Sequence, residues 1–264
     1  MAEALLEAKG VSKIFGGLTA VDHVDMTINK GDIFGIIGPN GAGKTTFFNM
    51  CTGFYTISEG FIYLNGKNIS NMPCDKIAHL GIARTFQNIK LFNYMSVLDN
   101  ISIGSHINTK TSMFDAILHT PRYRKDEKYI REQGYEILEK VGLSQYADTM
   151  AGNLPYGVQR KVEIARALAV KPQIILLDEP AAGMNPKETD SLMEFIKMLN
   201  AEGYTIALIE HDMKFVMNSC NRILVLNFGQ KICEGTPDEV KNDEKVKEAY
   251  FGKGIIAARG TKVC

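Results

Sequence analysis

One glycine-rich segment constrains this chain more than any other part of its sequence. Residues 38–45 read Gly-Pro-Asn-Gly-Ala-Gly-Lys-Thr and follow directly on the apolar run 33–37. Glycines allow a loop to wind so tightly that successive backbone N–H groups point inward at an anion, and a helix that begins there adds the positive end of its dipole. The segment therefore predicts a strand, a phosphate loop and a helix in that order, and with them a site for a nucleoside triphosphate.

The residues of this loop have distinct predicted roles. Lys44 reaches the β- and γ-phosphates as a point charge, and the hydroxyl of Thr45 is placed to ligate Mg²⁺. Backbone N–H groups of the loop are expected to make most of the remaining contacts with the phosphates. The residues expected to contact the nucleotide here are Gly38, Pro39, Asn40, Gly41, Ala42, Gly43, Lys44, Thr45 and Thr46.

The bulk composition is that of an ordinary globular protein. The chain has 264 residues, 45% of them apolar, which is enough for a substantial core. Its 30 basic and 30 acidic residues cancel without forming blocks, so nothing indicates a nucleic-acid partner. No apolar run approaches the roughly 18 residues that cross a bilayer, and the first ten residues lack the features of a signal peptide. We therefore expect a chain that stays in the cytosol.

Hydrophobic patterning indicates an α/β fold. Residues 5–30 alternate imperfectly between apolar and polar, and residues 61–64 precede an Asn-Gly turn, which together predict an antiparallel layer. Residues 174–177 and 206–209 are short unbroken apolar runs, typical of parallel strands covered on both faces.

Helical signals are concentrated in two parts of the chain. Between residues 93 and 158 the strand signals fade and helical spacing takes over, which predicts an inserted helical lobe. Asn185 and Thr236 each precede a proline and, three positions on, a glutamate, which predicts a capped helix start. We expect a single domain with a core formed by residues 1–92 and 159–240, a helical subdomain at 93–158 and a C-terminal extension at 241–264.

Four polar residues complete the predicted nucleotide site. Asp178 ends a buried run where the carboxyl end of a strand would present it to magnesium, and Glu179 can accept a proton from an attacking water as general base. His211 follows another such run and can donate a hydrogen bond to a γ-phosphate. Gln87 precedes the helical lobe, where its amide can contact magnesium or the attacking water. The residues predicted as catalytic are thus Glu179, His211, Lys44 and Gln87, and those predicted to bind the metal are Thr45, Gln87 and Asp178.

These motifs, taken in order, resemble the ATP-binding-cassette ATPases over nearly the whole chain. The resemblance rests on the phosphate loop 38–45, Gln87, the signature 154–159, the Asp178-Glu179 strand, the loop 181–186 and His211. It implies a RecA-like phosphate-loop ATPase core with an N-terminal antiparallel β layer and an inserted α-helical subdomain. It also implies ATP and Mg²⁺ as cofactors, and Phe15 as the aromatic residue that stacks on adenine.

Within this family the chain most resembles the longer ATP-binding subunit of branched-chain amino acid importers. Four strings carry this resemblance, at residues 12–18, 84–88, 179–189 and 209–213. It implies a peripheral protein on the cytoplasmic side of the inner membrane that energises separate permease subunits. A groove around residues 87–95 would receive a permease helix, and an extracytoplasmic solute-binding protein would act indirectly.

The signature departs from the family's common Leu-Ser-Gly-Gly-Gln. Pro155 stands in place of the serine and Val158 in place of the glutamine, so one contact to the γ-phosphate is missing. In the family this segment covers ATP bound to the phosphate loop of a second ATPase subunit. The resemblance therefore implies that Tyr156 and Gly157 bind nucleotide across a dimer, which the sequence leaves open as a homodimer or a heterodimer.

Three other interpretations compete with this one. Residues 29–32 match the Asn-Lys-x-Asp string of switch GTPases, but they precede the phosphate loop, whereas in GTPases that string follows it. Cassette ATPases of DNA repair or translation carry long coiled coils or two cassettes per chain, and neither occurs here. ATPases of other transport systems, including other amino acid or amide importers and lipopolysaccharide export, remain the nearest alternative.

Overall fold

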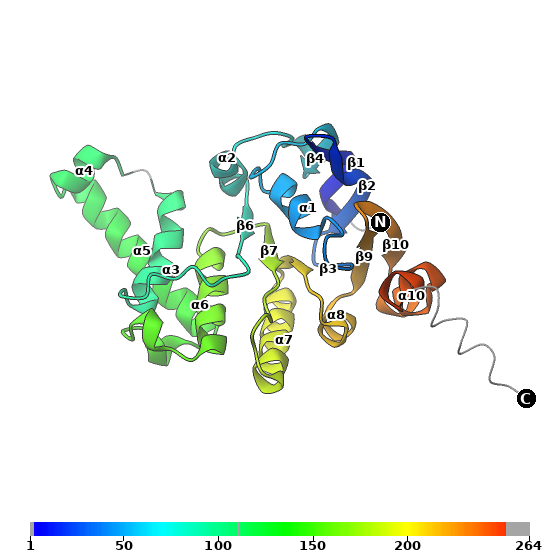
Figure 1. Cartoon of the computed structure of the whole chain (residues 1–264). Helices are drawn as coiled ribbons and strands as arrows, with labels where there is room; N and C mark the ends of the chain where they lie inside the picture. Colours follow the sequence, from blue (N-terminus) through cyan, green and yellow to red (C-terminus); the bar gives the residue numbers. More distant parts are fainter. Residues whose placement is uncertain (1–2, 110, 252–264) are drawn as a thin grey trace, which may run out of the picture.

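The computed structural model of the chain describes residues 3–109 and 111–251 (Figure 1). Residues 252–264, which belong to the expected C-terminal extension, lie outside the described residues. The α-helices are α1 (Lys44–Cys51), α2 (Cys74–His79), α3 (Val97–Ser105), α4 (Met113–Ile117), α5 (Pro121–Lys140), α6 (Tyr156–Leu168), α7 (Pro186–Ala201), α8 (Met213–Ser219), α9 (Pro237–Asn242) and α10 (Glu244–Phe251). Short 3₁₀ turns lie at η1 (His106–Asn108), η2 (Ser144–Tyr146) and η3 (Ala151–Asn153).

A mostly parallel sheet forms the centre of the molecule, with strand order β10-β9-β3-β8-β7-β6. Strands β9, β3, β8, β7 and β6 run parallel, and β10 pairs antiparallel with β9. Every residue of β3, β7 and β8 is buried, as the unbroken apolar runs predict for strands covered on both faces. The strands are β3 (Ile33–Ile37), β6 (Ile82–Arg84), β7 (Ile174–Asp178), β8 (Thr205–Ile209), β9 (Arg222–Asn227) and β10 (Gln230–Gly235).

A second, antiparallel sheet has the order β2-β1-β4-β5 and confirms the predicted N-terminal layer. Its strands are β1 (Ala4–Phe15), β2 (Leu18–Asn29), β4 (Glu59–Leu64) and β5 (Lys67–Asn68). Helix α1 packs between the two sheets, where its Phe47 and Phe48 join one apolar cluster with residues from both. The helix that follows the phosphate loop is thus held from two sides, which positions the loop itself.

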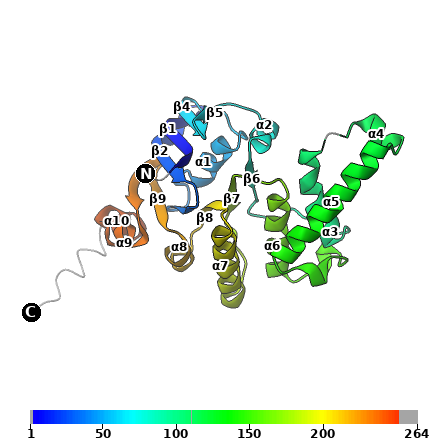
Figure 2. The same cartoon turned by 180° about the vertical axis from the view of Figure 1, so that it is seen from behind.

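The helices α3 to α6 stand beside the β6 edge of the central sheet (Figures 1 and 2). Leu98 and Ile101 of α3 and Ile164 and Leu168 of α6 lie in the same apolar cluster as the second face of the central sheet. Helix α5 buries Ile130 and Leu138, as its apolar spacing predicts. The helical region therefore shares a continuous core with the sheet.

Two capping predictions are confirmed by the structure. Asn185 accepts a hydrogen bond from the Glu188 backbone N–H at 3.0 Å, and the Glu188 carboxylate accepts one from the Asn185 N–H at 3.0 Å. Thr236 and Glu239 form the same reciprocal arrangement at the start of α9. Each box satisfies backbone donors that have no partner within the helix. Within residues 3–109 and 111–251, none of the helices combines the length and the apolar character needed to cross a membrane.

Ile164 tests whether the helical region and the sheet form one core. Its side chain is fully buried in the shared cluster, so Ile164→Ala should lower the free energy of unfolding by about 2–5 kcal/mol. Leu118→Ala is the control, because Leu118 is 73% exposed and its loss should change stability by less than about 0.5 kcal/mol. Urea unfolding followed by circular dichroism measures both. Two separate unfolding steps in the wild type, or similar midpoints for the two variants, would contradict the shared core.

Candidate functional site

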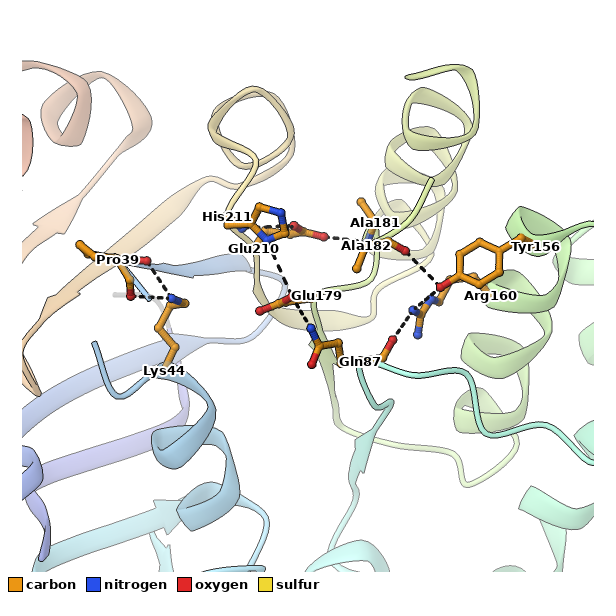
Figure 3. Close-up of polar contacts among 11 residues, drawn as sticks. Pro39, Lys44, Gln87, Tyr156, Arg160, Glu179, Ala181, Ala182, Glu210 and His211 are labelled. Atoms are coloured by element: carbon orange, nitrogen blue, oxygen red, sulfur yellow. Dashed lines mark hydrogen bonds and ion pairs between the residues drawn. The ribbon is translucent and has the colours of Figure 1, made fainter. Parts of the chain in front are cut away.

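The predicted site residues meet at one edge of the central sheet. The phosphate loop follows β3, His211 follows β8, Asp178 ends β7 and Gln87 lies just beyond β6. These four strands are consecutive neighbours in the sheet and run parallel. Their carboxyl ends therefore lie side by side, which is where ligands bind in open α/β sheets (Figure 3).

The backbone of the phosphate loop requires glycine at two positions. Gly38 has φ +153° and Gly43 has φ +96°. A Cβ at Gly38 would lie 2.1 Å from the Leu226 carbonyl oxygen, and one at Gly43 would lie 2.5 Å from the Ala20 carbonyl oxygen. The loop is therefore packed closely against its neighbouring backbone and shaped before any ligand arrives.

Lys44 lies folded over the loop and is 7% exposed. Its ammonium donates to the carbonyl oxygens of Gly38 at 2.7 Å and Pro39 at 3.0 Å (Figure 3). Burial lowers the pKa of Lys44, and the nearby carboxylates of Glu179 and Asp178 act in the opposite direction. A buried ammonium whose present partners are only carbonyls gains strongly from an anion, and phosphate oxygens supply one.

A hollow of about 540 Å³ opens at this loop. Residues 40–46 and Glu179 line it, together with residues 18–20 and Phe228, which the sequence reasoning missed. Phe228 is 86% exposed and has φ +46°, at the turn between β9 and β10. Its only sequence signal is a Phe-Gly pair after a strand, which is typical of any turn.

Phe15, predicted to stack on adenine, lies at the rim rather than among the residues that line this hollow. It ends β1 opposite Leu18, which lines the hollow. The Phe15 ring is 41% exposed and meets Tyr55 edge to face with 5.3 Å between centroids. The ammonium of Lys13 lies 4.9 Å from its centre. The ring is thus partly exposed near the hollow, and the stacking role of Phe15 stays a prediction.

Asp178 is buried, and Arg84 forms an ion pair with it. The Arg84 Nη2 donates to Asp178 Oδ2 at 2.6 Å, and both side chains are 6% exposed. In proteins that bind nucleotide phosphates, magnesium commonly has one or two oxygen ligands from the protein, and phosphates and water supply its other ligands. The Thr45 hydroxyl, which lines the hollow, and the Asp178 carboxylate supply oxygen donors of that kind. No group of three or more His, Cys, Asp or Glu that could hold a metal occurs in the described part of the chain.

Glu179 lies between Gln87 and His211 (Figure 3). Gln87 Nε2 donates to Glu179 Oε2 at 2.8 Å, and His211 Nδ1 lies 3.8 Å from the same oxygen. Glu179 has φ +45°, a left-handed conformation that costs a non-glycine residue energy and is frequent at functional sites. The structure therefore brings three predicted catalytic residues together at one carboxylate.

Glu210 is a further residue of this edge that the sequence reasoning did not single out. It is 1% exposed and accepts hydrogen bonds from the backbone N–H groups of Ala181 at 2.7 Å and His211 at 3.2 Å. Burial raises the pKa of Glu210, and those two hydrogen bonds act against the rise. The carboxylate thus ties the loop after Glu179 to the loop that carries His211. Its only signal in the sequence is its place between an apolar run and His211.

Tyr156 and Gly157 do not line the hollow of their own chain. The Tyr156 hydroxyl donates to the Ala182 carbonyl at 3.1 Å, and a Cβ at Gly157 would lie 3.3 Å from Cγ of Glu188. The signature therefore packs beside the loop and helix that follow Glu179. That Tyr156 and Gly157 bind a nucleotide held by a second subunit stays a prediction.

Arg160 connects the signature helix to the segment around Gln87. Its guanidinium donates to the carbonyl oxygens of Phe86 at 2.8 Å and Gln87 at 2.7 Å. It is fully buried and forms an ion pair with Glu163 at 2.8 Å. Burial raises the pKa of Glu163, while its hydrogen bonds with the Lys90 N–H and Arg160 oppose the rise. The signature helix α6 is therefore hydrogen-bonded directly to the backbone at Gln87.

A second hollow, called here the apolar groove, lies between α2, β6, α3 and α6. Its volume is about 410 Å³, and its lining includes Phe54, Arg84, Phe86, Gly104 and Arg166. Phe86 precedes the predicted permease groove, but residues 87–95 themselves are not part of this lining, so the predicted role of those residues stays a prediction.

Comparison with known proteins assigns the fold and the family. A family model described as ABC transporter matches residues 21–182, which include the phosphate loop, Gln87, the signature and Glu179. The chain belongs to this family. It is an ATP-binding-cassette ATPase, and the sequence-based prediction of its fold class is confirmed. A second model, described as branched-chain amino acid ATP-binding cassette transporter, matches residues 230–255.

Relatives match the chain over nearly its whole length. The high-affinity branched-chain amino acid transport ATP-binding protein LivG of Salmonella typhimurium is 44% identical over 96% of this chain and 100% of its own length. BraF of Pseudomonas aeruginosa, which carries the same description, is 43% identical over the same shares. A probable LivG of Methanocaldococcus jannaschii is 38% identical over 94% of this chain and 98% of its own.

Solved structures agree with the fold. An ATP-binding cassette of an ABC transporter in its ADP conformation superposes with a TM-score of 0.82 at 37% identity, covering 95% of this chain and 99% of its own. A dimeric cassette in a post-hydrolysis state, bound to ADP and Pi, gives a TM-score of 0.72 at 25% identity, covering 88% and 99%.

Gly43 tests the close packing of the phosphate loop. In Gly43→Ala the new Cβ would collide with the Ala20 carbonyl, so the loop must shift and ATP affinity should fall about tenfold or more, corresponding to about 1.4 kcal/mol. Gly203→Ala is the matched control, because Gly203 has φ +94° but no atom within 4 Å of the added Cβ. It should lose about 1–2 kcal/mol of stability and keep wild-type affinity. Titration with a fluorescent ATP analogue checks both, and equal affinities would contradict the packing argument.

Proposed function

We propose that this chain is the ATP-hydrolysing subunit of an importer that takes up branched-chain amino acids through separate permease subunits. The solute is inferred from the relatives, which are branched-chain amino acid transport ATP-binding proteins, and from the family model that matches residues 230–255. On this proposal the chain works as a peripheral protein on the cytoplasmic side of the cell membrane. An extracytoplasmic solute-binding protein delivers the amino acid, and no nucleic acid takes part.

The observation that carries ATP hydrolysis is the meeting of the phosphate loop and Glu179 in one hollow. The loop amides and Lys44 bind the triphosphate, and the preshaped backbone spends little free energy on ordering when the ligand arrives. Thr45 and Asp178 would hold magnesium, which would supply positive charge against the phosphates. Phe15, the strand partner of Leu18 in the lining of the hollow, would offer the base an aromatic face.

Glu179 is placed to accept the proton of the attacking water, and Gln87 orients it. Gln87 holds one carboxylate oxygen, so the other is left to face the water. His211 is at 3.8 Å, which is too long for a hydrogen bond, and catalytic hydrogen bonds often tighten only when substrate is present. His211 is then free to donate to the γ-phosphate.

Two cassettes are required for turnover on this proposal. The signature residues Tyr156 and Gly157 do not line their own nucleotide hollow, so on this proposal a second ATPase subunit brings a signature over it. The dimeric relative bound to ADP and Pi supports such a pairing. ATP binding favours the closed pair and hydrolysis releases it, because the nucleotide binds the two states with different affinity. The cycle of closing and opening drives the permease.

Glu179→Gln tests the hydrolytic half of the proposal. The amide cannot accept the proton of the water, so turnover should fall by about 100-fold or more, while ATP binding persists and a dimer accumulates. Glu202→Gln is the control, since Glu202 pairs only with Lys140 on the surface. ATPase assays and size-exclusion chromatography with ATP give the result. Full turnover in Glu179→Gln would remove Glu179 from the general-base role.

Uptake measurements test the transport half. The chain, its permease subunits and its binding protein, reconstituted in vesicles, should accumulate labelled leucine only when ATP is supplied on the side of this chain. Lys44→Ala in the same vesicles should stop accumulation, because this variant lacks the ammonium that binds the triphosphate. A tagged chain that copurifies only with soluble proteins, or vesicles that accumulate an unrelated solute, would overturn this assignment.

A further inference from the structure

Arg84 is a buried cation that no predicted role explains. It ends β6, next to the strand that Asp178 ends, and pairs with Asp178 at 2.6 Å. Both side chains are 6% exposed, so little water competes for either. The carboxylate proposed to bind magnesium is therefore held by a second residue through one of its oxygens, Oδ2.

Other contacts hold the Arg84 guanidinium independently of Asp178. Its Nη1 donates to Asn49 Oδ1 at 2.6 Å and to Thr52 Oγ1 at 3.2 Å. Both partners lie at the end of the helix that begins at the phosphate loop. Because Nη1 binds these residues while Nη2 binds Asp178, the planar fork fixes the direction from which the carboxylate is approached.

Three aromatic rings surround the same guanidinium. Its central carbon lies 6.0 Å from the ring centre of Phe48, 5.6 Å from that of Phe54 and 5.3 Å from that of Phe86. Such cation–π contacts favour a cation that is removed from water. Arg84, Phe54 and Phe86 also line the apolar groove. One side chain thus touches both the groove and the carboxylate at the nucleotide site.

We propose that Arg84 is a positioning residue that orients Asp178 toward magnesium and links that carboxylate to the apolar groove. This inference rests on the proposed function, since it assigns Asp178 to the metal of the ATP site. Residues that hydrogen-bond to a metal-ligating carboxylate fix its orientation, and their loss commonly weakens metal binding about 10- to 100-fold. Arg84 meets this description because it donates a hydrogen bond to Oδ2 of Asp178.

Arg84→Lys tests the orientation. Lysine keeps the charge, but a single ammonium cannot bind Asn49, Thr52 and Asp178 in a fixed fork. The readout is the ratio of ATP affinity with magnesium to ATP affinity in EDTA, measured by titration of the full chain. We expect this ratio to fall about tenfold in Arg84→Lys, while affinity in EDTA stays within about twofold because the phosphate loop and Lys44 are unchanged.

Arg166→Lys is the matched control, because Arg166 lines the same groove and has no contact with Asp178 among the described residues. Its ratio should equal that of the wild type. An unchanged ratio in Arg84→Lys would overturn the proposal, and a higher ratio would show that Arg84 competes with the metal instead. Affinity in EDTA reports whether the variant folds. A wild-type chain without any affinity for ATP would defeat the proposed function itself.

Phe54→Leu tests the link to the groove. It removes one of the rings that hold Arg84 without touching Asp178, so the same ratio should fall by about threefold. Phe92→Leu is the control, since Phe54 and Phe92 are both 52% exposed but Phe92 does not line the groove. A wild-type ratio in Phe54→Leu would refute the link and leave Arg84 as a residue of the metal site alone.

Discussion

The site depends on the parallel pairing of four strands. Strands β3, β8, β7 and β6 are hydrogen-bonded in that order, and each leads at its carboxyl end into one part of the site. Parallel pairing places those ends on a single edge, so groups separated by many residues become neighbours. Glu179 and the loop with His211 meet for this reason, because Asp178 is the register partner of Ile209.

Buried charge is the second organising element. Lys44, Asp178 with Arg84, Arg160 with Glu163, and Glu210 all lie largely out of water. Burying a charge is costly unless it is paired or hydrogen-bonded, and each of these has such partners. Lys44 bonds to carbonyl oxygens of its own phosphate loop, whereas the other charges bond to groups from another segment of the chain. These contacts connect the end of β7 to β6, the signature helix to the segment around Gln87, and the loop after β7 to the loop after β8.

Local sequence patterns predicted the fold well where a local cause decides the structure. The unbroken apolar runs became strands buried on both faces, and Asn185 and Thr236 became helix caps, because those outcomes depend on residues only a few positions apart. The residues that the sequence missed owe their place to distant partners. Arg84 and Glu210 are unremarkable in sequence, and only the pairing of strands puts Arg84 beside Asp178 and Glu210 beside the Ala181 amide.

By itself the sequence determined that this chain has a phosphate loop, a parallel core and an inserted run of helices, since glycine spacing and hydrophobic period depend on the local chain alone. Only the tertiary structure decided that the signature residues Tyr156 and Gly157 do not line their own nucleotide hollow, that Phe15 lies next to its lining and not in it, and that one arginine touches both Asp178 and the apolar groove. The physical reason is that strand order and register, which are set by burial of the whole core, decide which distant side chains meet.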